Sequence, residues 1–205
     1  YLLDRLCGLT FRLSPHSFYQ VNRRQAEQLY TLAQREAGLT GGETLLDLYC
    51  GTGTIGLTMA HCVRELIGVE IVPQAVEDAR LNAEQNGIEN ARFFCSDAAA
   101  AAEKLRQEGI APQVIIVDPP RKGCGADLCR TIGEMAPDRL VYVSCDPATL
   151  ARDIRFLRDE GYAPERITPV DMFPRTTHVE TVVLLSKGDI DSKNIRVEFS
   201  LKEWG

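Results

Sequence analysis

The sequence has no uninterrupted apolar run of the roughly 20 residues that a membrane-spanning helix needs. We expect no leader peptide, because the start carries Asp4 and Arg5 instead of a basic segment followed by an apolar stretch. We therefore expect a cytoplasmic protein that does not enter a membrane. There is no initiator Met, and a glycine-rich loop comes within the first quarter of the chain. We expect a fragment of a longer protein that lacks an N-terminal part.

The cysteines do not follow the spacing of a metal centre. The closest two, Cys124 and Cys129, are separated by four residues and have no second pair or histidine set nearby. The seven cysteines are also odd in number, which does not suit a complete set of disulfides. Four of them lie in or beside apolar segments, namely Cys50, Cys62, Cys95 and Cys145. We expect buried free thiols in a reducing compartment and no bound metal.

The chain has no excess of positive charge. Its 23 Lys and Arg residues face 29 Asp and Glu residues, which gives a net charge of -6. Taken alone, this argues against a nucleic-acid-binding protein, because neutralising phosphates requires basic side chains. A nucleic-acid substrate would require local basic groups or a missing N-terminal part to supply much of the attraction.

A regular alternation of short apolar runs and amphipathic stretches begins at residue 44. Strands are expected at 44–48, 65–69, 91–95, 114–117 and 140–143, and helices at about 54–61, 74–86, 98–108, 126–135 and 147–160. Strand–helix alternation with unbroken apolar strands is typical of a buried parallel sheet. We therefore predict an α/β protein with a doubly wound, mostly parallel sheet.

The ends of the chain follow a different pattern. Two strand-like runs, 162–173 and 179–186, are joined by a short connection and predict an antiparallel hairpin that closes the sheet. A further strand is expected at 195–201. No linker divides the chain, so we expect one catalytic domain at 44–205. Residues 1–43 are expected to be an N-terminal extension with one helix, at about 22–37, packed on that domain.

A glycine-rich loop follows the first predicted strand and opens a helix. Gly51, Gly53 and Gly56 match the G-x-G-x-x-G pattern of dinucleotide-binding proteins. Glu70 ends the second strand, where a ribose-binding acid belongs. A dinucleotide-dependent oxidoreductase is therefore one interpretation of this segment.

Four acids at successive strand ends favour a different ligand. They are Asp47, Glu70, Asp97 and Asp118. The carboxyl ends of parallel strands line one ligand crevice, and four acids suit a doubly negative pyrophosphate poorly. They suit S-adenosylmethionine, which carries a sulfonium, an ammonium, a ribose diol and an adenine amine. Glu70 can accept from the ribose hydroxyls and Asp97 from the adenine amine, while Asp47 can favour the ammonium or hold the loop amides.

Two further residues are candidates for chemistry. Cys145 stands at a strand–helix corner on the rim of the crevice, with Pro147 at the first helical position. A helix N-terminus favours a thiolate, and the alternative is a buried structural thiol. Glu180 enters a strand of Val and Leu, and if it faces inward, burial raises its pKa towards that of a useful base. An outward-facing Glu180 is the alternative.

The chain resembles the catalytic domain of the bacterial RNA uracil-5-methyltransferases, which make 5-methyluridine in 23S rRNA and in tRNA. The resemblance covers nearly all of residues 1–186 and rests on six motifs in order, at 17–22, 47–53, 68–70, 118–121, 144–147 and 178–181. It implies the class I S-adenosylmethionine-dependent methyltransferase fold and transfer of a methyl group to carbon 5 of a uridine in RNA. Asp146 stands where Asn is frequent in the family, and Thr54 where an Asn can occur.

The resemblance also implies the roles of individual residues. Cys145 is the nucleophile that adds to carbon 6 of uracil, and Glu180 is the base that removes the carbon-5 proton. Residues at the glycine loop and strand ends contact the cofactor, namely Gln20, Tyr49, Gly51, Thr54, Glu70, Asp97 and Asp118. The favoured substrate is 23S rRNA, with tRNA as the other, and a monomer is expected.

Other activities remain open at this level. Cytosine-5 RNA methyltransferases generally carry a second cysteine in the proline motif after the fourth strand, whereas Cys124 lies beyond that motif, at 118–121, in this chain. Amino-group methyltransferases use a similar motif and need neither Cys145 nor Glu180. The oxidoreductase and a non-catalytic RNA-binding module are the remaining alternatives.

Overall fold

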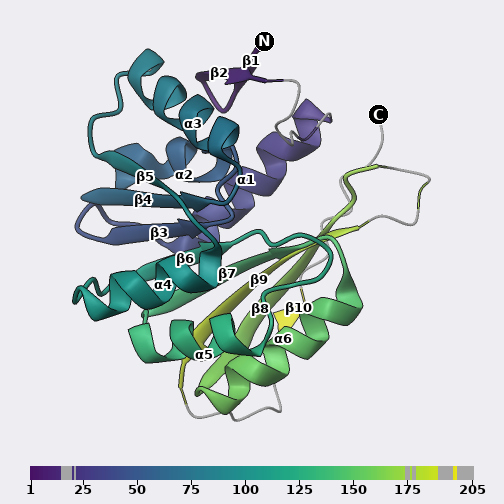
Figure 1. Cartoon of the computed structure of the whole chain (residues 1–205). Coiled ribbons are helices and arrows are strands. Elements are labelled where there is room, and N and C mark those ends of the chain that lie inside the picture. The colour runs from purple at the N-terminus through teal and green to yellow at the C-terminus, as the bar shows by residue number, and fades with distance from the viewer. Residues whose placement is uncertain (15–19, 21, 174–175, 177–178, 189–195, 198–205) are drawn as a thin grey trace.

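The computed structural model of the chain describes residues 1–14, 20, 22–173, 176, 179–188 and 196–197 (Figure 1). Its strands are β1 (Leu2–Leu6), β2 (Leu9–Leu13), β3 (Thr44–Leu48), β4 (Glu65–Glu70), β5 (Ala91–Cys95), β6 (Val114–Val117), β7 (Arg139–Ser144), β8 (Tyr162–Val170), β9 (Glu180–Lys187) and β10 (Arg196–Val197). Its helices are α1 (Arg23–Ala37), α2 (Thr54–Met59), α3 (Pro73–Gln85), α4 (Ala98–Gln107), α5 (Ala126–Met135) and α6 (Pro147–Asp159), with a 3₁₀ turn at Ala60–Cys62. None of these helices is long and apolar enough to cross a membrane.

The central sheet has the order β10-β8-β9-β7-β6-β3-β4-β5. Strands β3 to β7 are parallel to one another, as the alternating pattern predicted. Strand β9 lies between β7 and β8 and runs antiparallel to both. The doubly wound sheet and the C-terminal antiparallel hairpin are therefore confirmed. Of the strand expected at 195–201, only Arg196–Val197 lies within the described residues, where it pairs with β8.

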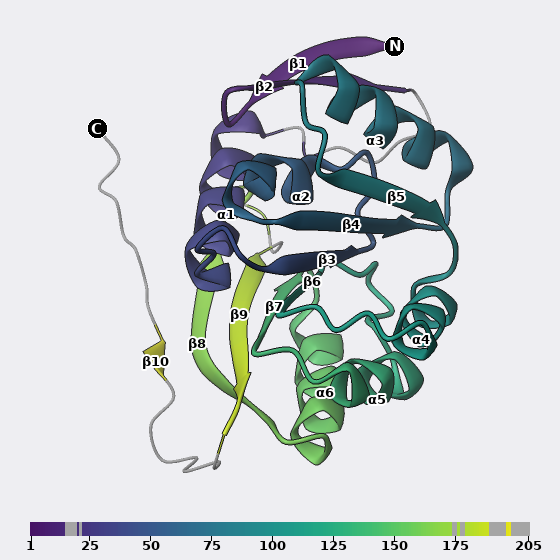
Figure 2. The ribbon, with the colours of Figure 1, turned by 90° about the vertical axis from the view of Figure 1, so that its left-hand side faces the viewer.

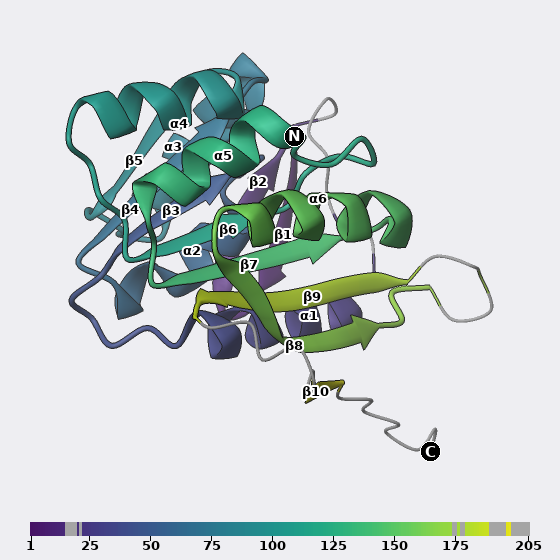
Figure 3. The ribbon, with the colours of Figure 1, turned by 90° about the horizontal axis from the view of Figure 1, so that it is seen from below.

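Helices cover both faces of this sheet because successive side chains of its strands point to opposite sides. Leu45 and Val141 pack with α1, α2 and α3 on one face. Leu46 and Leu140, their neighbours in sequence, pack with α4, α5 and α6 on the other. Figures 2 and 3 show the two layers, with α1 and α6 on opposite sides of the sheet. Both faces are thus buried, which explains why the strands are unbroken apolar runs.

The N-terminal extension holds an additional hairpin that the sequence analysis did not predict. Strands β1 and β2 form a separate two-stranded antiparallel sheet. Their turn is formed by Cys7 and Gly8, whose φ angles are 49° and 83°. Two successive positive φ angles are the geometry of a tight hairpin turn, which Asn-Gly signals more strongly than Cys-Gly does. The expected helix is confirmed as α1.

Asn82 of α3 joins this hairpin to the glycine loop. Its side chain is fully buried. Its Oδ1 accepts from the Arg12 amide at 2.6 Å, and its Nδ2 donates to the carbonyls of Arg12 at 3.2 Å and Thr52 at 3.1 Å. A buried amide that satisfies backbone groups of two segments is costly to remove, because each abandoned group remains desolvated.

We expect Asn82→Ala to lower the free energy of unfolding by roughly 1–3 kcal/mol, the cost of leaving buried polar groups unpaired. Chemical denaturation measures this difference. Glu84→Ala, on the exposed side of the same helix, is the matched control and should change stability by less than about 0.5 kcal/mol. Equal effects of the two substitutions would contradict a stabilising role for the Asn82 contacts.

Candidate active site

One edge of the sheet gathers the predicted site residues. The carboxyl ends of β3 to β7 meet there because these strands are parallel. Strand β9 runs the opposite way, so its first residues reach the same edge, and Thr181 pairs with Ser144 at the end of β7. Glu180 therefore begins its strand beside the point where Cys145 follows β7. Elements far apart in sequence thus bring these two residues together.

Asp47 holds the start of the glycine loop. It is only 1% exposed, and its Oδ2 accepts from the Gly56 amide at 2.9 Å. A Cβ on Gly56 would lie 2.7 Å from that oxygen, so the close approach requires glycine. Burial raises the pKa of Asp47 to about 7, with Glu70 adding to the shift and the Gly56 amide opposing it. Within the described part of the chain, Asp47 Oδ1 has no hydrogen-bond partner.

Glu70 ends β4 and reaches across to the loop. Its Oε2 accepts from the Gly51 amide at 3.1 Å, and its Oε1 accepts from the Val72 amide at 2.9 Å. Each carboxylate oxygen has two lone pairs, so each can accept a further bond. Tyr49, between β3 and the loop, adopts a φ of 67°, which non-glycine residues rarely do.

The other predicted cofactor residues differ in their burial and in the hydrogen bonds that they already make within the protein. Asp97 caps α4, and its Oδ1 accepts from the amides of Ala99 and Ala100 at 3.0 and 3.2 Å. Thr54 Oγ1 accepts from the Tyr30 hydroxyl at 3.2 Å. Gln20 is 7% exposed. The lone pairs of Asp97 Oδ2 lie outside this capping pattern, so a ligand contact there is compatible with the cap.

Asp118 stands at the end of β6. Its amide donates to the Leu48 carbonyl at 3.4 Å, which continues the pairing of β6 with β3. Burial, followed by the charges of Glu180 and Asp47, raises the pKa of Asp118 to about 8. Acids from three strands therefore interact at this edge, and positive charge placed among them would favour their ionised forms.

Cys145 lies in a tight corner between β7 and α6. The Asp146 amide donates to Ser144 Oγ at 3.2 Å, and that hydroxyl donates to the Asp146 carbonyl at 3.0 Å, so two bonds bracket the cysteine. Burial, followed by the carboxylates of Glu180 and Asp118, raises the pKa of the Cys145 thiol, while Arg121 opposes the shift. The expectation that the helix N-terminus favours a thiolate is wrong in its net direction, because burial and the two acids raise the pKa of the thiol.

Glu180 is partly buried, and burial raises its pKa, which confirms the direction expected from its apolar strand. Arg121 and Lys122, in the loop after β6, are exposed near this edge. His178 and Arg175, which stand beside Glu180 in the sequence, lie outside the described residues.

Comparison with known proteins identifies the family. A family model described as tRNA (Uracil-5-)-methyltransferase matches residues 5–188. The chain belongs to this uracil-5-methyltransferase family. The resemblance inferred from the six motifs is thereby confirmed.

Relatives of this family member share about half of its residues. An uncharacterized RNA methyltransferase of Lactiplantibacillus plantarum is 52% identical over 187 residues, covering 90% of this chain and 40% of the relative. Another, of Clostridium acetobutylicum, is 51% identical over 186 residues, covering 91% of this chain and 40% of the relative. The chain thus spans about two fifths of the length of these curated relatives.

Solved structures agree with the family fold. The crystal structure of Pyrococcus abyssi tRNA (uracil-54, C5)-methyltransferase in complex with S-adenosyl-L-homocysteine is 35% identical, with a TM-score of 0.78, over 90% of this chain and 44% of that one. A precorrin-6y C5,15-methyltransferase from Geobacter metallireducens matches at 13% identity with a TM-score of 0.68, over 87% of this chain and 93% of that one, which supports the fold alone.

The cysteines of this uracil-5-methyltransferase family member are all free thiols, as expected. Cys50 and Cys129 are buried, but Cys95 is exposed, so burial was wrongly expected for it. Strand β5 is an outermost strand of the sheet, and its last residue, Cys95, is exposed. No group of three potential metal ligands gathers among the described residues.

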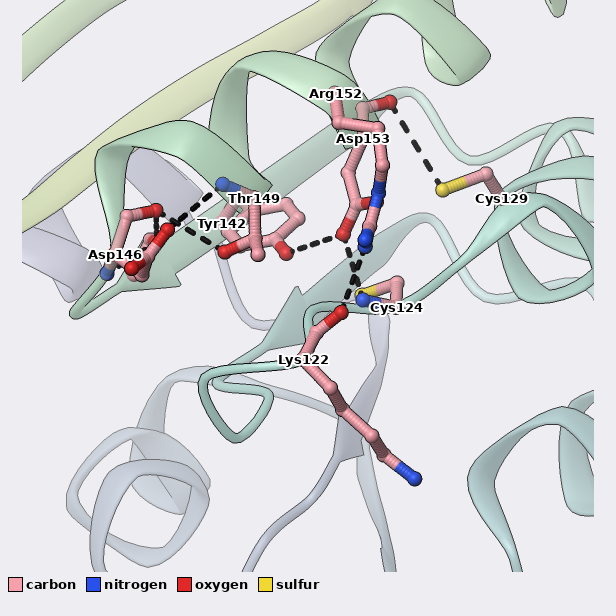
Figure 4. A network of polar contacts seen from close by, with 9 residues as sticks. Lys122, Cys124, Cys129, Tyr142, Asp146, Thr149, Arg152 and Asp153 are labelled. Atoms are coloured by element: carbon pink, nitrogen blue, oxygen red, sulfur yellow. Dashed lines mark hydrogen bonds and ion pairs between the residues drawn. The ribbon is translucent and has the colours of Figure 1, made fainter.

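One polar cluster of this family member was missed by the sequence analysis. Asp153 of α6 is fully buried and accepts from the Tyr142 hydroxyl, the Cys124 amide and the Arg152 side chain (Figure 4). A signal was present, because Asp153 falls between Leu150 and Leu157 on the buried stripe of the helix. An acid on an apolar stripe requires partners to offset its burial.

Proposed function

We propose that the chain transfers a methyl group from S-adenosylmethionine to carbon 5 of a uridine in RNA. The observation that carries this proposal is the meeting of Cys145 and Glu180 at the acid-lined edge of the sheet. A thiol and a partly buried carboxylate are the two groups that covalent addition and proton removal require. The family membership and the S-adenosyl-L-homocysteine complex of the Pyrococcus abyssi relative support the same reaction.

The residues at the edge fit S-adenosylmethionine. Glu70 has lone pairs for the ribose hydroxyls, and Asp47 Oδ1 is a buried acceptor without a partner among the described residues. Asp118 is a further acid at this edge, and a positively charged ligand beside it would favour its ionised form. Gln20, Tyr49, Gly51, Thr54 and Asp97 are the other residues proposed to contact the cofactor. When bound, the cofactor supplies a methyl group on a sulfonium, the electrophile that carbon 5 needs.

Cys145 activates the uracil ring in this proposal. Its sulfur forms a bond to carbon 6, and the electrons of the carbon 5–carbon 6 double bond move towards oxygen 4, which makes carbon 5 nucleophilic. After carbon 5 has gained the methyl group, Glu180 takes the remaining carbon-5 proton. The electrons of that bond re-form the double bond and expel the Cys145 thiolate. The raised pKa of the Cys145 thiol favours its protonated form, so its proton must leave before the sulfur can bond to carbon 6.

The proposed RNA is 23S rRNA, and the target base must leave its stack to reach the edge, at a cost of a few kcal/mol. Arg121 and Lys122 are exposed there and can hold phosphates, against the net charge of -6. The Pyrococcus abyssi relative is named for a tRNA uridine, so tRNA is the second candidate. We also propose that the chain acts as a monomer, which light scattering tests.

The reaction is tested by tritium transfer from methyl-labelled S-adenosylmethionine into 23S rRNA and tRNA transcripts, with product analysis for 5-methyluridine. Incorporation into 23S rRNA alone supports the full proposal, and incorporation into tRNA corrects the substrate. Absence of cofactor binding by calorimetry, together with a nicotinamide absorbance change, would favour the oxidoreductase. Mass mapping of 23S rRNA from cells that lack the gene identifies the uridine.

We expect Glu70→Gln to weaken S-adenosylmethionine binding by roughly tenfold to a hundredfold, because hydrogen bonds to charged groups contribute about 1.5–3 kcal/mol. The substitution also disturbs the Gly51 amide that Glu70 accepts from. Isothermal calorimetry measures the affinity. Glu77→Gln, exposed on α3, is the control, and an unchanged affinity for Glu70→Gln would remove Glu70 from the cofactor site.

A further inference from the structure

The buried Asp153 carboxylate is a junction of four hydrogen bonds (Figure 4). Its Oδ2 accepts from the Cys124 amide at 2.6 Å and from the Tyr142 hydroxyl at 2.7 Å. Its Oδ1 accepts from Arg152 Nε at 3.0 Å and Nη2 at 2.8 Å. Such a set of partners offsets the cost of burying the charge. The junction therefore links α6, β7 and the loop after β6.

The loop after β6 is held at three consecutive residues. Arg152 Nη2 donates to the Lys122 carbonyl at 2.7 Å, and the Cys124 amide donates to Asp153. Gly123 lies between them with a φ of 75°, and a Cβ there would collide with the Asp153 carboxylate. The Gly123 amide in turn donates to the Pro120 carbonyl at 2.8 Å. The backbone after Arg121 is thus fixed to α6, and the bond from Gly123 to Pro120 closes a turn around Arg121.

Among the described residues, Arg121 is the cation that lowers the pKa of the Cys145 thiol. The described acids that raise this pKa, after burial, are Glu180 from β9 and Asp118 from the end of β6. The pKa of Asp146, the residue after Cys145, is lowered mainly by the hydrogen bond from the Thr149 amide. The charge of Arg121 lowers it further. Asp118 is tied separately to β3 through the Leu48 carbonyl. A shift of the clamped loop would therefore move Arg121 while leaving Asp118 with the sheet.

We propose that Asp153 and Arg152 are positioning residues that hold the loop bearing Arg121 at the strand–helix corner where Cys145 stands. This inference rests on the proposed role of Cys145 as the nucleophile. We call the hydrogen bonds from Asp153 and Arg152 to this loop the clamp. Asp153 lies on α6 and accepts from the hydroxyl of Tyr142 on β7, so the clamp is anchored to the two elements that flank Cys145. The hydrogen bonds that make up this arrangement all lie within the protein, between α6, β7 and the loop after β6.

The test is the pH dependence of Cys145 alkylation by iodoacetamide, followed by mass spectrometry of the Cys145 peptide in the folded chain. In Asp153→Asn and Gly123→Ala, we expect the midpoint to rise by a few tenths of a unit to about 1 unit, because the thiolate loses a nearby opposite charge. S-adenosylhomocysteine affinity should stay at the wild-type value. Asp127→Asn, exposed on α5, is the matched control with an unchanged midpoint.

Two further substitutions keep the test decisive. Arg152→Gln removes the guanidinium that bonds to the Lys122 carbonyl and to Asp153. The Arg152 side chain is partly exposed, so this variant tests the clamp even if Asp153→Asn does not fold. Arg121→Gln should raise the midpoint by itself, and adding Gly123→Ala to it should cause no further rise. Wild-type midpoints for Gly123→Ala and Arg152→Gln would overturn the proposal. So would a parallel loss of cofactor affinity and thermal stability, which indicates a structural role alone. Methyl transfer by Cys145→Ala would instead overturn the proposed function.

Discussion

Replacement of Cys145 by alanine is expected to abolish methyl transfer and to leave cofactor binding unchanged. Without the sulfur, no bond forms to carbon 6, and carbon 5 of uracil stays a poor nucleophile. The loss of an enzyme's nucleophile lowers turnover by roughly 10⁴-fold to 10⁶-fold. Tritium incorporation into RNA measures turnover, and calorimetry with S-adenosylhomocysteine measures binding.

The control for this substitution is Cys62→Ala, which removes a partly buried thiol whose sulfur accepts from Gln34 away from the site edge. It should retain methyl transfer. Methyl transfer by Cys145→Ala would contradict the covalent mechanism. Joint loss of activity and cofactor binding would instead indicate a folding defect. The two readouts together therefore separate chemistry from stability.

Glu180→Gln is expected to trap RNA on the protein. Addition of Cys145 and methylation of carbon 5 do not need a base at Glu180, but release of the thiolate requires loss of the carbon-5 proton. The amide cannot accept that proton, so turnover should fall by roughly 10²-fold to 10⁴-fold, the usual contribution of a general base. A denaturation-resistant band containing protein and methyl-labelled RNA is the expected product.

Glu165→Gln, exposed on the neighbouring strand β8, should turn over normally and form no lasting adduct. The double substitution of Cys145→Ala with Glu180→Gln should also show no adduct, because the sulfur is absent. Rapid release of 5-methyluridine-containing RNA by Glu180→Gln would assign proton removal to another group. Asp118 would then be the first residue to substitute, since its pKa of about 8 lies in the range of a useful base.

Several features of the fold could be predicted from local sequence alone. The apolar runs at β3, β6 and β7 indicated buried strands because both of their faces must be covered. The glycine pattern at 51–56 and the acid at Glu70 indicated a ligand edge, since parallel strands end on one side. The N-terminal hairpin escaped prediction because Cys7-Gly8 is a weak turn signal, although both residues adopt positive φ angles.

The electrostatics of the site depended on residues that no local pattern connects. A helix N-terminus beside Cys145 suggested a lowered thiol pKa, but burial raises it, and Glu180 and Asp118, which approach from other strands, raise it further. The helical spacing placed Asp153 on the buried stripe of α6, but its partners Tyr142 and Cys124 lie on other elements and no sequence pattern indicated them. In both cases the deciding partners come from separate elements that only folding brings into contact.

The sequence by itself determined the class of fold and the edge of the sheet where the strand-end acids gather, because apolar runs, strand ends and glycines are local properties. The pair of candidate catalytic residues was implied by the resemblance to a known family. The tertiary structure decided how that pair meets. Strand β9 inserts antiparallel between β7 and β8, and its register sets Thr181 opposite Ser144. Glu180 consequently arrives at the edge where Cys145 leaves β7. Strand order and register arise from long-range packing and hydrogen bonding, so the geometry of the site is a property of the folded chain.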